Sequence, residues 1–434
     1  MPPLQPLALR MWKHHRLSQY RRLVFLILAL NAAFLYTLVR QWGALEAVPL
    51  TTLANLVVVN IAAAILIRQQ HAINLLFTLA LSAPLSWPLW IRQRLGKVAH
   101  FGGVHSGGTV AGPLWFALVA YVLTRRFAGG SPGVSAATLG VTYALLALLV
   151  LVIVMALPPL RKRYHDAFEL THRFGGWAAL VLFWLHTVLL IDAQRGDAAL
   201  ANALASSLGF WLLLLVTSSI LYPWLRLRRV PVRLERPSDH AVIAHFDYGV
   251  TPAPGQTNAI SLNPLREWHA FATIATPGEE GYRMIISRSG DWTGAFIDAL
   301  PSHVWIKSVP PMGVNGVSQL FRRVVWVVTG SGIGPTMPLI LATQEPVHLV
   351  WSARNHRATY GDALVGEILA KVPHALLWDT DERGRPDLVK LAFEAVRDFD
   401  AEAVVCISNQ KLTRSVIYGL ESRGTPAYGA IWDS

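Results

Sequence analysis

The sequence is poor in cysteine and in charged residues. Cys406 is its single cysteine, which excludes a disulfide framework and cysteine-ligated zinc or iron–sulfur sites. Only 15% of the 434 residues are charged, whereas soluble domains carry about a quarter. This composition disfavours an ordinary soluble enzyme.

Acidic residues are scarcest in the first half of the chain. Residues 1–229 contain 5 acidic and 20 basic residues, a net charge of +15, whereas residues 230–434 contain 21 and 18, a net charge of −3. The basic residues of the first half lie between long apolar runs, which disfavours nucleic-acid binding. The pattern predicts a membrane domain over 1–229 followed by a soluble part.

Apolar runs long enough to cross a bilayer occupy about 23–39, 51–91, 104–123, 137–157, 174–191 and 207–225. The 51–91 run contains Arg68, Gln69, Gln70 and His71, so it is either two spans or one crossing with a bent piece. Six spans place 14 basic residues on one face against four on the other, which follows the positive-inside rule. We therefore predict six spans, with 51–91 as one irregular crossing. The N-terminus and the C-terminal part are then cytoplasmic, in a plasma or bacterial inner membrane, and the N-terminus is not a cleavable signal.

Histidines within these runs are candidate haem ligands. His172 and His186 share one predicted span and lie 14 residues apart, which is about 20 Å along a helix axis and about 40° from facing the same way. His105, or its neighbour His100, begins the 104–123 span at a depth similar to that of His172. Two imidazoles from neighbouring helices suit a haem iron, although hydrogen-bonded core histidines are the alternative.

The second half of the chain changes character. Short alternating runs separated by turn residues predict a small antiparallel β-barrel over 230–320. Strands alternating with helices predict a doubly wound parallel sheet over 321–434. Between the strand Val324–Thr329 and a helix lies the loop 330–335, whose glycines and helix N-terminus favour a pyrophosphate; its candidate residues are Gly330, Gly332, Gly334 and Pro335.

The segment RKRYHDAFELTHRFGG…LH resembles the membrane domain of ferric reductases and NADPH oxidases. The resemblance implies six helices and two stacked b-type haems. His172 and His186 match the histidine pair on the fifth helix, and His105 matches the inner position on the third, with His100 as the competing choice. Leu118 and Val119 stand where the outer third-helix histidine is expected. Either only one haem is present, or another ligand such as His71 serves the outer haem, with His186 alternatively an acceptor-site residue.

The segments WHAFAT (268–273) and SRSGDWT (287–293) resemble the FAD domain of the ferredoxin-reductase type, as found in NADPH oxidases. The resemblance covers about residues 20–434. It implies that FAD is bound by His269, Phe271 and Thr273 and by a turn containing Gly313, and that the nicotinamide nucleotide meets Arg354, Arg385 and Cys406. It also implies that the region from Tyr428 to Trp432 brings an aromatic ring over the flavin. A looser resemblance is to the C-terminal regions of some fungal adenylating proteins, although this sequence contains no adenylation domain.

The resemblance implies a membrane oxidoreductase that passes electrons from NAD(P)H through FAD to haem. The acceptor would be ferric iron, oxygen, quinone or a partner redox protein. Two alternatives stay open from the altered motifs: a membrane-anchored flavin reductase with one or no haem that serves a partner, and a degenerate regulatory flavoprotein.

Overall fold

The computed structural model describes residues 1–430 except 132, 277 and 308, and its contacts divide the chain into two compact units. We call residues 19–69 and 101–225 the helical unit. We call residues 1–18, 70–100 and 226–430 the mixed unit, because it contains all the described strands.

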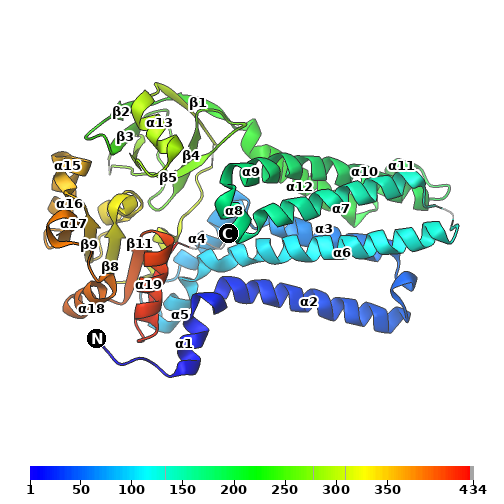
Figure 1. Ribbon diagram of the computed structural model, residues 1–434, viewed down its shortest axis with the longest axis horizontal. Coiled ribbons are helices and arrows are strands. Elements are labelled where there is room, and N and C mark those ends of the chain that lie inside the picture. Colours follow the sequence, from blue (N-terminus) through cyan, green and yellow to red (C-terminus); the bar gives the residue numbers. More distant parts are fainter. Residues whose placement is uncertain (132, 277, 308, 431–434) are drawn as a thin grey trace. The chain divides into compact units, whose positions relative to one another are not determined.

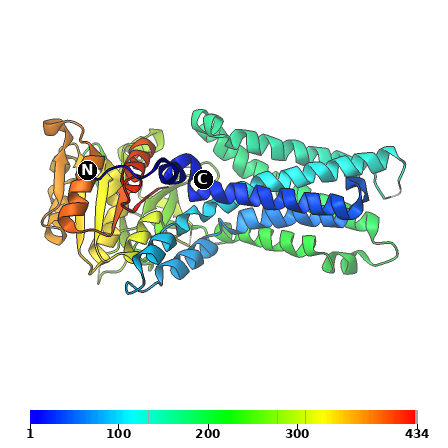
Figure 2. The ribbon, with the colours of Figure 1, turned by 90° about the horizontal axis from the view of Figure 1, so that it is seen from below.

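Long apolar helices build the helical unit, and they lie side by side with their axes aligned (Figures 1 and 2). They are α2 (Gln19–Trp42), α3 (Leu50–Leu66), α6 (Gly102–Ala128), α7 (Ala136–Ala156), α10 (Gly176–Gln194) and α12 (Leu208–Leu225). Shorter pieces lie between them: η2 (Leu45–Ala47), α8 (Pro158–Arg163), α9 (His165–Leu170), the π-helical η4 (Thr171–Gly175) and α11 (Leu200–Ala205).

Five helices of the described chain are long and apolar enough to cross a membrane. A sixth is counted if α3 and α4 (Gln70–Leu81), which are bent by 68° at the break between them, form one span. The polar residues Arg68 to Gln70 stand at this break, because their side chains suit a helix end better than an apolar span. The irregular 51–91 run is therefore a bent helix pair followed by α5 (Leu89–Leu95).

Close helix packing in the helical unit depends on small residues of α6. A Cβ atom at Gly108 would lie 2.6 Å from the carbonyl oxygen of Asn60 on α3. The Asn60 side chain in turn exchanges hydrogen bonds with Asn31 on α2, at 2.9 and 3.1 Å. Glycine contacts and amide pairs of this kind hold apolar helices together where the hydrophobic effect cannot.

Two open antiparallel sheets occupy the part of the mixed unit that was predicted as a barrel. The first has the order β1-β7-β4-β5 and the second β2-β3-β6. Their bounds are β1 (Arg228–Pro231), β2 (Arg233–Glu235), β3 (Ala241–Phe246), β4 (Thr257–Ser261), β5 (His269–Ala272), β6 (Tyr282–Ser287) and β7 (His303–Ile306), with α13 (Asp291–Ala299) before β7. The prediction of a barrel was wrong in this respect, since the ladders among the described residues do not close.

A parallel sheet of order β10-β9-β8-β11-β12 follows, as expected for a doubly wound fold. Its strands are β8 (Val324–Thr329), β9 (Val347–Ala353), β10 (Leu376–Asp379), β11 (Ala403–Ile407) and β12 (Ala427–Gly429). One face packs on α14 (Ile333–Ala342) and α16 (Asp362–Lys371), and the other on α18 (Leu388–Phe399) and α19 (Gln410–Glu421). The short helices are η1 (His15–Leu17), α1 (Leu7–Lys13), η3 (Val98–Phe101), η5 (Val314–Leu320), η6 (Gly330–Gly332), α15 (His356–Tyr360) and α17 (Thr380–Arg383).

Residues 70–100 pack within the mixed unit, although the sequence analysis placed them in the membrane half. Arg92 on α5 is 3% exposed and forms a bidentate ion pair with Glu402, at 2.8 and 3.0 Å. Its Nη1 also donates to the carbonyl oxygen of Leu320 at 2.7 Å. On α4, Asn74 bonds the backbone at Pro310 and Met312. The segment is thus bound to the sheets by buried polar contacts.

Candidate functional site

A cavity of about 860 Å³ lies at the carboxyl ends of the parallel strands in the mixed unit. Ligands of open α/β sheets bind at this edge, where the strand order reverses. Three of the residues predicted to bind nucleotide line it, namely Gly330, Arg354 and Arg385. Ser352 and Asn355 line it beside Arg354, and three lining residues were not predicted: Thr329, Asn409 and Lys411. A position at or just after a strand end could have indicated Thr329 and Asn409, whereas Lys411 lies on α19.

The rim of this cavity is positively charged. Arg354, Arg385 and Lys411 line it, against the single carboxylate of Asp381 among the described lining residues. The Arg354 guanidinium lies 3.9 Å from Asp381 and is 82% exposed, so it is available to a ligand. Such an excess of cations favours a phosphate-bearing molecule.

Glycines shape the loop that begins at the end of β8. Gly330 has φ +51°, a left-handed conformation that glycine adopts without strain. A Cβ atom on Gly332 would lie 2.5 Å from the carbonyl oxygen of Ile407, so this glycine sets how closely the loop approaches β11. Gly334 and Pro335 open α14, whose first turn carries no acidic residue. The start of α14 carries the partial positive charge of a helix N-terminus, and this charge faces the loop.

We expect Gly332→Ala to destabilise the mixed unit by about 1–3 kcal/mol, because the added methyl overlaps a backbone atom. If the cavity binds a nicotinamide nucleotide, the change should also weaken that binding at least tenfold, since the loop must shift away from β11. The matched control is Gly366→Ala on α16, where a Cβ meets nothing within 4 Å. That change should be neutral or stabilising by about 0.5–1 kcal/mol. Thermal unfolding and nucleotide titration of both variants test this, and equal behaviour would contradict the packing role.

An aromatic stack stands on the strand predicted to bind flavin. The ring of His269 stacks on Trp292 of the GDWT segment, with ring centres 4.0 Å apart, and Phe271 lies 6.3 Å from the same indole. Phe296 continues the stack at 5.1 Å from Trp292. Thr273 is 1% exposed, and its hydroxyl donates to the carbonyl oxygen of Gln256 at 3.0 Å. The structure thus brings the two predicted flavin segments together.

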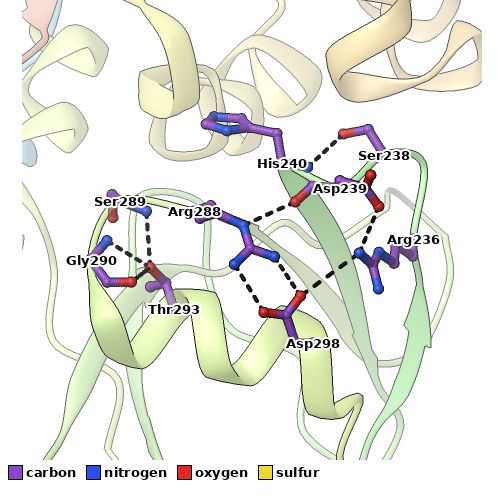
Figure 3. A network of polar contacts seen from close by, with 9 residues as sticks. All are labelled: Arg236, Ser238, Asp239, His240, Arg288, Ser289, Gly290, Thr293 and Asp298. Atoms are coloured by element: carbon purple, nitrogen blue, oxygen red, sulfur yellow. Dashed lines mark hydrogen bonds and ion pairs between the residues drawn. The ribbon is translucent and has the colours of Figure 1, made fainter.

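Polar contacts tie the SRSGDWT segment to the edge of the 860 Å³ cavity (Figure 3). Thr293 accepts hydrogen bonds from two backbone N–H groups at the start of α13, at 2.9 and 3.1 Å. Arg288 pairs with both carboxylate oxygens of Asp298, and its Nε donates to the carbonyl oxygen of Asp239. The neighbouring His240 lines the cavity. The network therefore fixes a cavity residue relative to the flavin segment.

The turn that contains Gly313 is fixed by Asn315, which is 3% exposed. The Asn315 side chain donates to the carbonyl oxygen of Pro335 at 2.6 Å. A Cβ atom on Gly313 would lie 2.6 Å from the Asn315 side-chain oxygen. The turn that contains Gly313, predicted to bind FAD, and the glycine loop 330–335 are therefore held together by the side-chain amide of Asn315.

Cys406 faces the packing layer of α18 and α19 and is fully buried. Burial raises the pKa of its thiol to about 12. It does not line the nucleotide cavity, so the structure does not bring it together with Gly330 and Arg354. Tyr428 is also buried, and its hydroxyl donates to the carbonyl oxygen of Gln93 at 3.0 Å. Trp432 lies outside the described residues.

Cys406 should be inert toward a thiol reagent in the folded chain at pH 8, because its thiol is protonated and inaccessible. The measurement is the time course of labelling before and after denaturation. We expect one thiol per denatured chain and none per native chain over the same interval. Rapid native labelling would instead place Cys406 beside an open site.

Two predicted haem ligands meet in the helical unit. His105 on α6 and His172 in the π-helical turn η4 have ring centres 6.4 Å apart. The Nδ1 of His105 lies 2.9 Å from the carbonyl oxygen of Ala64. A carbonyl only accepts, so Nδ1 carries the proton and Nε2 keeps its lone pair. The positive charge of Arg68 acts on both imidazoles.

This pair fits a haem iron on two counts. Two imidazoles that bind one iron from opposite sides through bonds of about 2 Å have ring centres roughly 6 Å apart, close to the 6.4 Å observed. A ligating histidine also usually donates its other ring N–H to a backbone carbonyl, as His105 does. Arg68 would suit a haem propionate. The residues present therefore fit one haem here.

His186 does not fit a second bis-histidine site. Its Nε2 lies 3.0 Å from the hydroxyl of Thr142, and the ring of Phe116 packs against it at 5.1 Å. Leu118 and Val119 on α6 occupy the positions expected for the outer third-helix histidine, and neither can bind iron. Within the described residues, the level of His186 thus lacks a partner imidazole.

The two remaining candidates, His71 and His100, belong to the mixed unit. His71 lies at the start of α4, which packs with the sheets. His100 lies in η3, with Nδ1 3.1 Å from the carbonyl oxygen of Lys97.

In comparisons with known proteins, the chain is similar to adenylate-forming reductases and, over a shorter stretch, to an NADPH oxidase. Residues 314–434 match a family model described as the C-terminal domain of adenylate-forming reductase 03009. Over 425 residues the chain is 44% identical to adenylate-forming reductases 03009 and 06235 of Coprinopsis cinerea, which covers 97% of this chain but 41% of each relative. The chain thus spans about two fifths of the length of these relatives. NADPH oxidase 3 of Rattus norvegicus is 36% identical over 98 residues, 19% of this chain and 17% of that protein.

Solved structures give weaker likenesses. A flavohemoglobin from Malassezia yamatoensis with bound FAD and heme has a TM-score of 0.44 and 16% identity, covering 88% of this chain and 99% of that one. A ferredoxin NADP+ reductase from Neisseria gonorrhoeae with bound FAD and NADP has a TM-score of 0.38 and 12% identity, covering 47% and 98%. Ferric reductase specificity stays a prediction.

Proposed function

We propose that the chain is a membrane oxidoreductase that takes electrons from NAD(P)H through FAD to one b-type haem. The observation that carries this proposal is the pair His105 and His172, with ring centres 6.4 Å apart and a lone pair left on His105 Nε2. The names of the relatives, which are reductases and an NADPH oxidase, support electron transfer from a nicotinamide nucleotide. The acceptor would be ferric iron, oxygen or a redox partner.

The cavity at the carboxyl edge of the parallel sheet would hold the nicotinamide nucleotide. Gly330, whose missing Cβ would have only the Tyr360 hydroxyl within 4 Å, leaves room for its pyrophosphate beside the start of α14, and Gly332 holds the loop against β11. Arg354, Arg385 and Lys411 would bind its phosphates. Since three cations line the rim against one carboxylate, we propose NADPH, which carries an extra phosphate, rather than NADH.

FAD would be held by His269, Phe271 and Thr273 with the turn at Gly313. When bound, flavin accepts a two-electron hydride and haem iron accepts single electrons. The chain's own part is to hold the stacked rings in place and to position His240 at the cavity edge through the Arg288–Asp298 pair. The apolar helices would lie in a plasma or bacterial inner membrane, with both termini on the cytoplasmic side.

A second candidate follows from the relatives. The chain matches two fifths of two adenylate-forming reductases, so it would serve as the electron-supplying part of a longer protein. Its partner would then be a covalently attached module rather than a separate redox protein. The two candidates share the same nucleotide and flavin sites and differ in the acceptor.

The test is oxidation of NADPH by the purified full chain with a soluble one-electron dye as acceptor. Arg354→Ala should raise KM for NADPH about tenfold and leave KM for NADH within twofold, because one charge-assisted bond to the extra phosphate is lost. Arg94→Ala, an exposed arginine on α5, is the matched control. Absence of NADPH and NADH oxidation in flavin-loaded protein would refute the proposed function.

A further inference from the structure

A second cavity, of about 410 Å³, lies in the helical unit beside His186. Its walls are mainly apolar and come from α3, α6, α10 and α12. Phe116 and Phe183 bring aromatic rings to it, with ring centres 5.8 Å apart. Polar side chains line it near the end of α10 and the start of α12; they are Gln194, Ser206 and Ser207. The cavity is therefore amphipathic and of a size that takes a small organic molecule.

The charge of this cavity excludes ionic ligands. Arg195 is the one charged residue among its described lining. Its Nε donates to Asp192 at 2.6 Å and its Nη1 to the carbonyl oxygen of Ala198 at 2.7 Å. Since Arg195 is already paired, it offers little to a phosphate or carboxylate. The described lining also lacks a carboxylate for a metal cation, so it favours an uncharged occupant.

His186 gives the cavity one oriented polar group. The hydroxyl of Thr142 donates its only proton to the carbonyl oxygen of Thr138 at 2.7 Å. It must therefore accept from His186 Nε2, which lies 3.0 Å away. The Nδ1 of His186 is then the unprotonated nitrogen, ready to accept a hydrogen bond. His186 is 4% exposed, so this acceptor is sheltered from water.

We propose that this cavity, in place of a second haem, binds a quinone and its hydroquinone. The aromatic rings would contact the faces of the quinone ring, an apolar tail would extend along the lipid-facing helices, and a hydroquinone O–H would donate to His186 Nδ1. As an acceptor, the quinone would undergo NADPH + H⁺ + quinone → NADP⁺ + hydroquinone. This redox consequence rests on the proposed function, whereas the binding does not.

The test measures binding to the purified full chain by equilibrium dialysis, with a decyl-substituted benzoquinone and its hydroquinone as probes. We expect one saturable site per chain. Ile191→Trp, which fills the cavity from its wall, should weaken binding of both probes at least tenfold. The matched control is Leu185→Trp on the same helix; Leu185 is 45% exposed and does not line the cavity. This control should change binding less than twofold.

His186→Phe separates the hydrogen bond from the packing. It should weaken hydroquinone binding about tenfold, the effect of one buried hydrogen bond, and leave quinone binding within about threefold. Uptake that never saturates, or equal losses in the Ile191 and Leu185 variants, would overturn the proposal in favour of lipid or detergent in the cavity. NADPH oxidation with the soluble dye is measured on the same samples. Normal dye reduction without probe binding refutes this inference alone, and probe binding without dye reduction refutes the proposed function alone.

Discussion

Arg92→Ala should lower the thermal unfolding midpoint of the full chain by about 10 °C, the largest stability effect we expect from a single substitution. Arg92 is 3% exposed and forms four hydrogen bonds, two of them to Glu402. Removing one partner of a buried ion pair typically costs about 3–5 kcal/mol. The Glu402 left behind is 20% exposed and keeps the bond from the Arg322 N–H, so we expect the lower end of this range. The matched control is Arg94→Ala, an exposed arginine two residues along the same helix, which should shift the midpoint by less than about 2 °C.

The pH dependence of this loss distinguishes the ion pair from simple packing. Burial disfavours the charged form of Glu402, but the bonds from Arg92 and the Arg322 N–H outweigh it and hold its pKa below the ordinary 4.5. A lowered folded pKa contributes stability above pH 4.5 that is lost as the pH falls through the folded pKa. In Arg92→Ala the buried carboxyl protonates readily. The difference between the two proteins should therefore shrink below about pH 4.5, and a constant difference would contradict the ion-pair account.

His172→Ala should abolish haem binding, the largest functional effect we expect. His172 and His105 are the one imidazole pair in the described helical unit at the spacing that an iron with two axial histidines requires. Without His172, His105 alone would hold the haem iron. Haem content per purified chain, measured with the optical spectrum, should fall from one to less than about 0.2.

His186→Ala is the matched control for this experiment. The two histidines lie on one helical segment, but His186 bonds Thr142 and faces no second imidazole. Its removal should leave haem content unchanged. His71→Ala should do the same, because His105 and His172 already supply the two imidazoles that one haem requires. Full haem in His172→Ala, or loss of haem in His186→Ala, would reverse the ligand assignment.

Local patterns were enough to predict most of the elements. The runs HAVIAHF and YRMIIS became β3 and β6, because alternating side chains with turn residues at both ends leave few other conformations. The parallel pairing of the last sheet follows from strands alternating with helices, whereas its strand order was not predicted. The closed barrel was wrong, because ladder closure depends on pairing between distant strands that no local pattern encodes. The role of residues 70–100 was missed for the same reason, since Arg92 and Glu402 are 310 residues apart in the chain.

The residues of the candidate site also fall into those that local sequence patterns predict and those that they do not. Gly330, Arg354 and Arg385 could be found because glycine loops and strand ends have recognisable sequence contexts. Lys411 and His240 reach the same cavity from a helix start and a turn, where sequence offers no comparable signal. Cys406 has the expected strand position but the opposite side of the sheet, since side-chain direction alternates with each residue and a shift of one reverses it.

The measurement that tests the central claim most directly is anaerobic addition of NADPH to the purified full chain, with flavin and haem spectra recorded together and both cofactors quantified. The account predicts one flavin and one haem per chain, with the haem becoming reduced after the flavin and with a spectrum typical of two histidine ligands. A flavin that is reduced while the haem stays oxidised would contradict it. So would two haems per chain, or none.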